Sequence, residues 1–179
     1  MDPTTAAGAP STVHRARHGG EVGAIRFSGT WRTTAPADDV YAVVADLTTW
    51  PRWWPAIRAV EPVTGDPGAP DEARFTFDTP APLPPLVVGI AVTGRVAGSE
   101  LEVAATDGPI DGEGRLTVRA DDGATGTAFA LRLEVRSLLL KPVEMVLASA
   151  ARGSARERLA RAGDDLAALA GGEPLPHDL

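Results

Sequence analysis

The sequence predicts an α+β fold in which an antiparallel sheet of seven strands is covered by one long helix near the C-terminal end. Seven stretches have the residue pattern of strands, and short turns join most consecutive ones, which favours antiparallel pairing. One long stretch, residues 142–170, repeats apolar residues every three or four positions. Two shorter helical stretches follow the first strand. Only the long helix can cover the apolar face of such a sheet.

The composition narrows the class of protein. The chain has 179 residues, 44% of them hydrophobic, which suffices for one domain with a sizeable core. Its formal net charge of −7 excludes the basic footprint of a nucleic-acid-binding domain. The absence of cysteine excludes disulfides, thiol nucleophiles and Cys-based metal sites. No apolar run is long enough to span a membrane, and the N-terminal residues lack a signal-peptide core. We therefore expect a cytoplasmic protein without a metal or cofactor.

The domain boundaries follow from local composition. Residues 1–20 are rich in Ala, Thr, Gly and Pro and are expected to form a disordered arm. The folded domain is expected over residues 21–171, with a tail over 172–179. The three histidines, His14, His18 and His177, all lie in these expected tails. This placement argues against a Ser-His-Asp triad or a His-rich metal site inside the domain.

The first strand and the two short helices come next. Residues 24–34 alternate, with Ile25, Phe27 and Trp31 on one face. Pro36 and the acids at 38–39 begin a helix, and its buried stripe is predicted to contain Val40, Val43, Val44 and Leu47. Residues 46–55 then hold three of the four tryptophans, Trp50, Trp53 and Trp54. They form either a hydrophobic plug against the sheet or, through Trp54, part of the wall of a ligand cavity.

Six further strands are predicted after the tryptophans, over residues 57–63, 72–78, 86–96, 101–106, 110–119 and 126–135. The last two form a hairpin across a strong turn signal at residues 121–123. In the strand 110–119, the alternation predicts that Asp111 and Glu113 face solvent. If the glycines reversed that alternation, the two acids would instead form a paired-carboxylate site.

The long helix is bounded by clear signals. Pro142 suits a first helical position, and Gly171 and Gly172 suit its end. The apolar stripe is small in its first half, where it holds Ala148 and Ala151. The second half is large and is built on leucines. Large residues can close against a sheet, whereas small ones either allow close packing or leave room. We expect a hollow beside the first half of the helix.

The order of elements, together with the segment Ala-Pro-Ala-Asp-Asp-Val-Tyr…Asp-Leu-Thr-Thr-Trp-Pro-Arg-Trp-Trp-Pro at 35–55, resembles the START-like (SRPBCC) superfamily. Its polyketide cyclase/dehydrase and lipid-transport branch is the most similar, over about residues 22–170. The resemblance implies a helix-grip fold, in which a curved sheet clasps the long helix over an apolar cavity. Members bind lipids, sterols, polyketides, hormones or aromatic compounds, and some catalyse cyclisation, dehydration or hydrolysis. The resemblance implies no catalytic set that can be placed on this chain.

Candidates for acid–base chemistry are few. Without a histidine or cysteine in the domain, such chemistry falls to carboxylates, Tyr41, Arg or Lys. Glu144 is the best carboxylate candidate because its helical angle lies near the apolar stripe. The alternative is that Glu144 only complements the helix dipole in the first turn. The catalytic residues, if any, stay unknown at this point.

We expect the protein to bind a hydrophobic or aromatic small molecule, lipid- or polyketide-like, between the sheet and the long helix. One alternative is a cyclase or dehydratase that uses inward carboxylate, Tyr or Arg side chains. Another is a scaffold for a protein partner. The chain is expected to be a monomer or a weak homodimer. The residues predicted to line the cavity are Trp31, Trp54, Phe75, Phe77, Ile90, Phe129, Leu131, Leu147 and Ala151.

Overall fold

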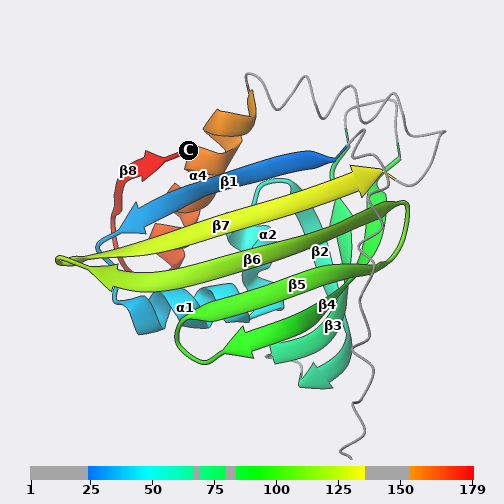
Figure 1. Cartoon of the computed structure of the whole chain (residues 1–179), viewed down its shortest axis with the longest axis horizontal. Coiled ribbons are helices and arrows are strands. Elements are labelled where there is room, and N and C mark those ends of the chain that lie inside the picture. Colours follow the sequence, from blue (N-terminus) through cyan, green and yellow to red (C-terminus); the bar gives the residue numbers. More distant parts are fainter. Residues whose placement is uncertain (1–23, 67–68, 80–83, 136–153) are drawn as a thin grey trace, which may run out of the picture.

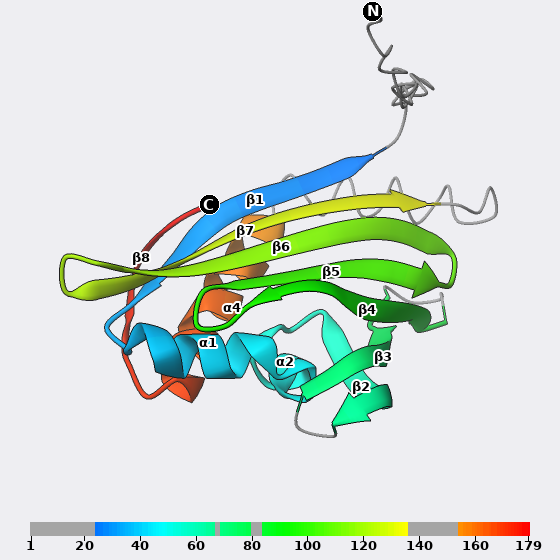
Figure 2. The ribbon, with the colours of Figure 1, turned by 60° about the horizontal axis from the view of Figure 1, so that its bottom comes forward.

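The computed structural model describes residues 24–66, 69–79, 84–135 and 154–179. It confirms the α+β class: one curved antiparallel sheet lies over helices that cover its inner face (Figures 1 and 2). The elements in chain order are β1 (Ile25–Thr33), α1 (Ala37–Ala45), the 3₁₀ turn η1 (Leu47–Thr49), α2 (Trp50–Trp53), β2 (Ile57–Asp66), β3 (Ala69–Phe77), β4 (Leu86–Val96), β5 (Glu100–Asp107), β6 (Ile110–Asp121), β7 (Ala124–Val135), α4 (Ser154–Leu169) and β8 (Pro174–Asp178).

The sheet order is β2-β3-β4-β5-β6-β7-β1-β8. Strands β2 to β7 follow one another as a meander, and β1 then pairs with β7 in an antiparallel register that runs from Ile25 opposite Leu133 to Thr33 opposite Thr125. In the part of the chain that the structure describes, the sheet has eight strands, one more than the seven predicted. The eighth strand, β8, pairs with β1 at the edge of the sheet. Its two prolines, Pro174 and Pro176, are typical of an edge strand but equally of a tail, which is why the sequence did not reveal it.

The predicted turn between β6 and β7 is present. Asp121 lies opposite Ala124, so Asp122 and Gly123 alone make the turn. Both have positive φ, 38° and 81°. This is the backbone of a type I′ turn, whose twist matches that of the two strands, and Asp-Gly is one of the few pairs that adopts it readily. The hairpin register then decides which residues of β6 and β7 face inward.

The end of α4 also follows its sequence signal. Gly171 has a φ of 77°. Its N–H donates to the Ala168 carbonyl at 3.2 Å, and the Gly172 N–H donates to the Ala167 carbonyl at 2.9 Å. These bonds satisfy carbonyls that the last helical turn would leave free. The segment 142–153, where the sequence predicts the first half of this helix, lies outside the described residues, as do Glu144, Leu147 and Ala151.

A buried core lies where α1, α2 and α4 meet the sheet (Figure 2). Val40, Val44 and Leu47 are fully buried, as the predicted stripe requires, and Val43 is partly buried. The Trp50 indole N–H donates to the Val44 carbonyl at 3.0 Å, which ties α2 to α1. α4 contributes Ala162 and Leu166 to the same core. Among the described residues, these helices bury the part of the inner face that lies beneath them.

Candidate functional site

The inner face of the sheet divides into two regions, which we call the closed half and the open half. The closed half is buried under the helices, Trp50 and Trp53 of α2 among its cover, and its strand side chains are Trp31, Phe75, Leu101, Leu116, Val118 and Phe129. The open half is apolar but only partly buried; it includes Trp54, which follows α2, and the strand side chains Ile25, Phe27, Phe77, Ile90, Val92, Leu131 and Leu133.

The strand register places Phe27 and Leu131 of the open half in one row with the buried positions Gly114 and Val103. Phe27 lies opposite Leu131, and Leu131 lies opposite Gly114. Gly114 in turn lies opposite Val103 on β5. Residues opposite one another in a sheet share a face, so these four positions form one row across four strands. The Leu131 Cδ2 atom lies only 2.7 Å from where a Cβ on Gly114 would be. The glycine thus makes room for the leucine to lie across the sheet.

An aromatic network links the two halves. Trp31 stacks on Phe129 with ring centres 4.2 Å apart, deep in the closed half. Trp54 meets Trp31 edge to face at 5.5 Å. Phe77 stacks beside Phe75 at 6.1 Å. Trp54 and Phe77 therefore stand at the boundary, each with one side against the core and part of its surface exposed.

The nine predicted lining residues fall into three groups. Trp31, Phe75 and Phe129 are buried in the closed half, with at most 3% of their surface exposed, so they support the site rather than offer contact surface. Leu147 and Ala151 lie outside the described residues. The four that remain belong to the open half, where a ligand could touch them: Trp54, Phe77, Ile90 and Leu131. Their role in ligand binding stays a prediction.

The paired-carboxylate alternative on β6 is wrong. The buried positions of that strand are Ile110, Gly114, Leu116 and Val118, so the acids at 111 and 113 point to the other face. There Glu113 lies opposite Arg132, and Asp111 lies opposite Glu134. The turn at Asp122-Gly123 sets this phase, and the glycines do not reverse it.

Charged groups elsewhere on the sheet also lie on its outer face. Arg115 hydrogen bonds to Glu102 and lies 3.9 Å from Glu100. The hydrogen bond to Glu102 raises the pKa of Arg115 above its ordinary value, with a further contribution from the charge of Glu102. Asp78 lies 4.0 Å from Arg58. These ion pairs are exposed on the outer face of the sheet and do not form a reaction centre.

The Tyr41 side chain forms a hydrogen bond within the fold. Its hydroxyl donates to the Glu100 carbonyl at 3.4 Å, which joins α1 to β5. It is partly buried against the closed half.

Within the described residues, no three carboxylate or imidazole side chains gather as a metal ion requires. No helix in those same ranges has the length and apolarity to cross a membrane.

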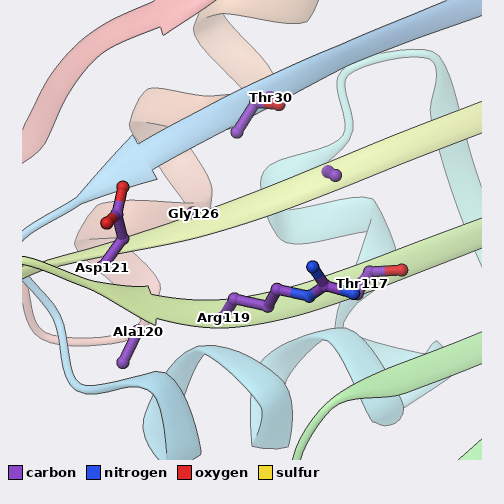
Figure 3. A pocket seen from close by; sticks show the side chains of 7 residues that line it. Thr30, Thr117, Arg119, Ala120, Asp121 and Gly126 are labelled. Carbon is purple, nitrogen blue, oxygen red and sulfur yellow. The ribbon is translucent and has the colours of Figure 1, made fainter.

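Two open hollows lie away from the inner face. One, of about 500 Å³, is on the outer face of β1, β6 and β7, where Thr30, Thr117, Arg119 and Gly126 line it (Figure 3). The other, of about 330 Å³, lies near the Asp122-Gly123 turn and the start of α1. Neither corresponds to the cavity expected from sequence, which was placed beside the helical segment 142–153.

Sequence reasoning missed one structured side chain, His177. It was assigned to a tail, yet its side chain is only 6% exposed and contacts Asp164 of α4. The signal was weak but present, because Leu175, His177 and Leu179 alternate with exposed residues as strand residues do.

The fold has many solved counterparts. A START superfamily protein from Mycobacterium smegmatis matches with a TM-score of 0.59 and 22% identity, over 76% of this chain and 92% of that one. The Zhui aromatase/cyclase from Streptomyces sp. R1128 matches with 0.58 and 17%, over 79% and 93%. Ginseng major latex-like protein 151 from Panax ginseng matches with 0.57 and 10%, over 82% and 97%. At these identities the likeness establishes the fold alone.

At the level of sequence, no curated protein matches this chain. The family model described as polyketide cyclase / dehydrase and lipid transport matches residues 24–167. That range runs from the start of β1 into α4 and includes both halves of the inner face. The chain therefore belongs to the polyketide cyclase/dehydrase and lipid transport family.

Proposed function

We propose that the protein binds a neutral hydrophobic or aromatic small molecule, lipid- or polyketide-like, against the open half. The observation that carries this proposal is the contrast in burial on one continuous apolar face. Folding buries the closed half completely but leaves Phe27, Phe77 and Leu131 only partly covered. Burial of apolar area is worth about 25 cal/mol per Å², so a ligand that covers these side chains gains affinity without polar contacts.

The chemistry of the open half favours a neutral ligand. Its inward positions on β1, β6 and β7 hold Ile25, Phe27, Gly112, Gly114, Leu131 and Leu133. None of these can ionise. A charged group buried against them would lose its hydration with no compensating partner, which is costly. The aromatic edges of Trp54 and Phe77 suit a flat or aromatic ligand.

The experiment is a titration of the purified chain with a fluorescent fatty-acid or polyaromatic probe, followed by quenching of tryptophan emission. Replacement of Leu131 by Trp should fill the open half and lower probe affinity at least about tenfold. The matched control is Ala130→Trp, one residue away on the exposed outer face, which should bind as wild type does. Unchanged binding by folded Leu131→Trp would contradict the proposal.

If Leu131→Trp does not fold, Leu131→Ala provides the second test. It enlarges the open half, so it should shift preference toward a bulkier probe while circular dichroism stays native. Native mass spectrometry of the protein as purified would show whether a small molecule accompanies it. Equal preference for all probe sizes in Leu131→Ala would count against this surface as the binding site.

The cyclase or dehydratase alternative depends on an ionisable group beside the ligand. The named inward positions of the open half supply none, so that role would fall to Glu144. Replacement of Glu144 by Gln should abolish turnover of a poly-β-ketone substrate while leaving probe binding intact, if the alternative holds. Turnover that survives this substitution would remove Glu144 from the reaction.

A further inference from the structure

β8 is seated in two notches that glycines create. A Cβ on Gly163 of α4 would lie 2.5 Å from Trp31 Cδ1 and 2.6 Å from His177 Nε2. A Cβ on Gly29 of β1 would lie 2.9 Å from Leu179 Cδ2 and 2.8 Å from the Asp178 carbonyl. Real Cβ atoms do not approach other atoms so closely, so both positions need glycine for β8 to pack here. The strand thus contacts β1 on one side and α4 on the other (Figure 1).

His177 occupies an irregularity in the strand pairing. Arg32 lies opposite Leu175, but Thr30 lies opposite Asp178, so the register shifts between them. At the shift the Arg32 backbone N–H donates to Nδ1 of His177 at 3.1 Å. The imidazole takes the place that a strand carbonyl would fill in a regular ladder.

This hydrogen bond indicates which nitrogen of the neutral ring carries the proton. An Nδ1 that accepts from a backbone N–H carries no proton, so the proton of the neutral ring is on Nε2. Nε2 lies 3.2 Å from Asp164 Oδ1 and donates to it. Both ring nitrogens therefore make a hydrogen bond, and both hydrogen bonds hold β8 in place.

Protonation of the ring would disrupt the contact with the Arg32 N–H and add charge to the contact with Asp164. A proton on Nδ1 would turn the acceptor into a donor that faces the Arg32 N–H. The contact with Asp164 would gain charge, but the Asp164 side chain is 55% exposed, and an exposed ion pair gains little. The two donors would face each other at 3.1 Å and repel, so the ring and the Arg32 backbone would have to move apart.

The other charged groups around the ring do not change this balance. The Arg32 guanidinium lies 3.8 Å from Asp121, toward the β6–β7 turn. On α4, Arg161 is exposed one turn before Asp164. Glu173 and Asp178, on the same segment as His177, are exposed as well. Among the described residues, Asp164 is the charged side chain that contacts the imidazole.

β8 also borders the candidate site. Leu179 is partly buried and packs against the core beside Gly29 and Phe129. Gly29 lies between Phe27 of the open half and Trp31 of the closed half. Movement of β8 would therefore uncover the β1 side of the inner face where the two halves meet.

We propose that β8 is a pH-sensitive clasp, in which neutral His177 holds the strand across β1 and α4 and protonation of its imidazole loosens the strand and opens the inner face to exchange of ligand. The role in ligand exchange rests on the function proposed above. The clasp itself rests only on the hydrogen bonds and glycine notches of β8.

The clasp is tested first without any ligand. Long-range ¹H–¹⁵N NMR of the full chain should show His177 in the Nε2–H form at neutral pH, with its signals assigned by their loss in His177→Asn. Amide exchange at Arg32 should be slow at neutral pH and faster, after correction for intrinsic rates, once His177 is protonated. An Nδ1–H ring, or Arg32 exchange indifferent to His177 protonation, would overturn the clasp.

The second test measures probe dissociation by stopped flow as the pH is lowered. Dissociation should quicken roughly tenfold as His177 becomes protonated. His177→Asn keeps an acceptor for the Arg32 N–H but cannot take up a proton, so its dissociation rate should not follow pH. The same pH dependence in both proteins would show that the strand does not control exchange.

The two proposals fail differently. If no probe binds wild type at any pH, the ligand-binding function is wrong, while the ring form and the Arg32 exchange still decide the clasp. If probe binds tightly but its release ignores His177, binding stands and the gating role of β8 is wrong.

Discussion

The closed and open halves of the inner face are built from the same strands and nearly the same residue types, yet they differ in cover. Phe75 and Phe77 illustrate this, because they share a strand and a face and stack on each other, yet Phe75 is fully buried and Phe77 only partly so. The difference lies in the helices above them. η1 and α2 bring Leu47, Trp50 and Trp53 over the closed half. Hydrophobicity alone therefore does not decide which of these side chains stay exposed; among the described residues, the position of the helices does.

The sharpest way to test that contrast is to truncate the two phenylalanines separately. Phe75→Ala removes a ring packed on all sides and should lower the free energy of unfolding by about 3–5 kcal/mol. Phe77→Ala removes a partly exposed ring and should cost about 1–2 kcal/mol. Urea denaturation measures both. Equal losses would mean that the two halves do not differ in packing.

The seam between α4, β1 and β8 should be nearly as sensitive. Gly163→Ala places a methyl group against Trp31 and His177, and should destabilise the protein by about 2 kcal/mol. The control is Gly126→Ala on the outer face, whose Cβ would meet Thr30 Cγ2 at an ordinary 3.5 Å. Thermal unfolding monitored by circular dichroism compares the two. A mild effect of Gly163→Ala would show that β8 is not tightly seated.

A smaller effect is expected from a buried hydroxyl at the far end of the closed half. The Thr125 hydroxyl donates to the Ala35 carbonyl at 2.7 Å and ties β7 to the start of α1. Thr125→Val keeps the shape but leaves the carbonyl without this donor, at a cost of about 1–2 kcal/mol. Thr117→Val, on the outer face, should change stability by less than about 0.5 kcal/mol. If both substitutions proved equally mild, the hydroxyl would have no role in positioning α1.

The smallest effect is expected on the outer face, at Arg115. Its raised pKa means that the ion pair stabilises the fold below the ordinary arginine range and loses this contribution only as pH rises through the folded-state value, in strong alkali. Arg115→Gln should therefore leave the pH dependence of the melting temperature unchanged between about pH 5 and 9. A new pH dependence within that range would mean that the ion pairs of the outer face contribute more to stability than expected.

Local chemistry accounts for much of this structure. The alternation of β6 correctly predicted that Leu116 and Val118 face inward and that Asp111 and Glu113 face outward. The turn at Asp122-Gly123 and the helix end at Gly171 followed from the few conformations open to those residues. Each of these outcomes depends on neighbours a few positions away, which the sequence displays directly.

The candidate site was only partly accessible from sequence. The described residues among those predicted to line it belong to the inner face, but nothing in their spacing distinguished the buried Trp31 from the half-buried Trp54. His177 was misjudged altogether. Its surroundings come from Arg32 on β1 and from Asp164 beside Gly163 on α4, and Arg32 lies 145 positions away in the chain.

By itself, the amino-acid sequence determined the class of fold, the inward face of the strands and the ends of the turn and helix, because those depend on side-chain periodicity and local backbone preferences. Only the tertiary structure decided which part of the apolar face is covered and that β8 joins the sheet. Cover and edge pairing are contacts between segments distant in the chain, and they depend on how the curved sheet, its glycine notches and the helices fit together in space.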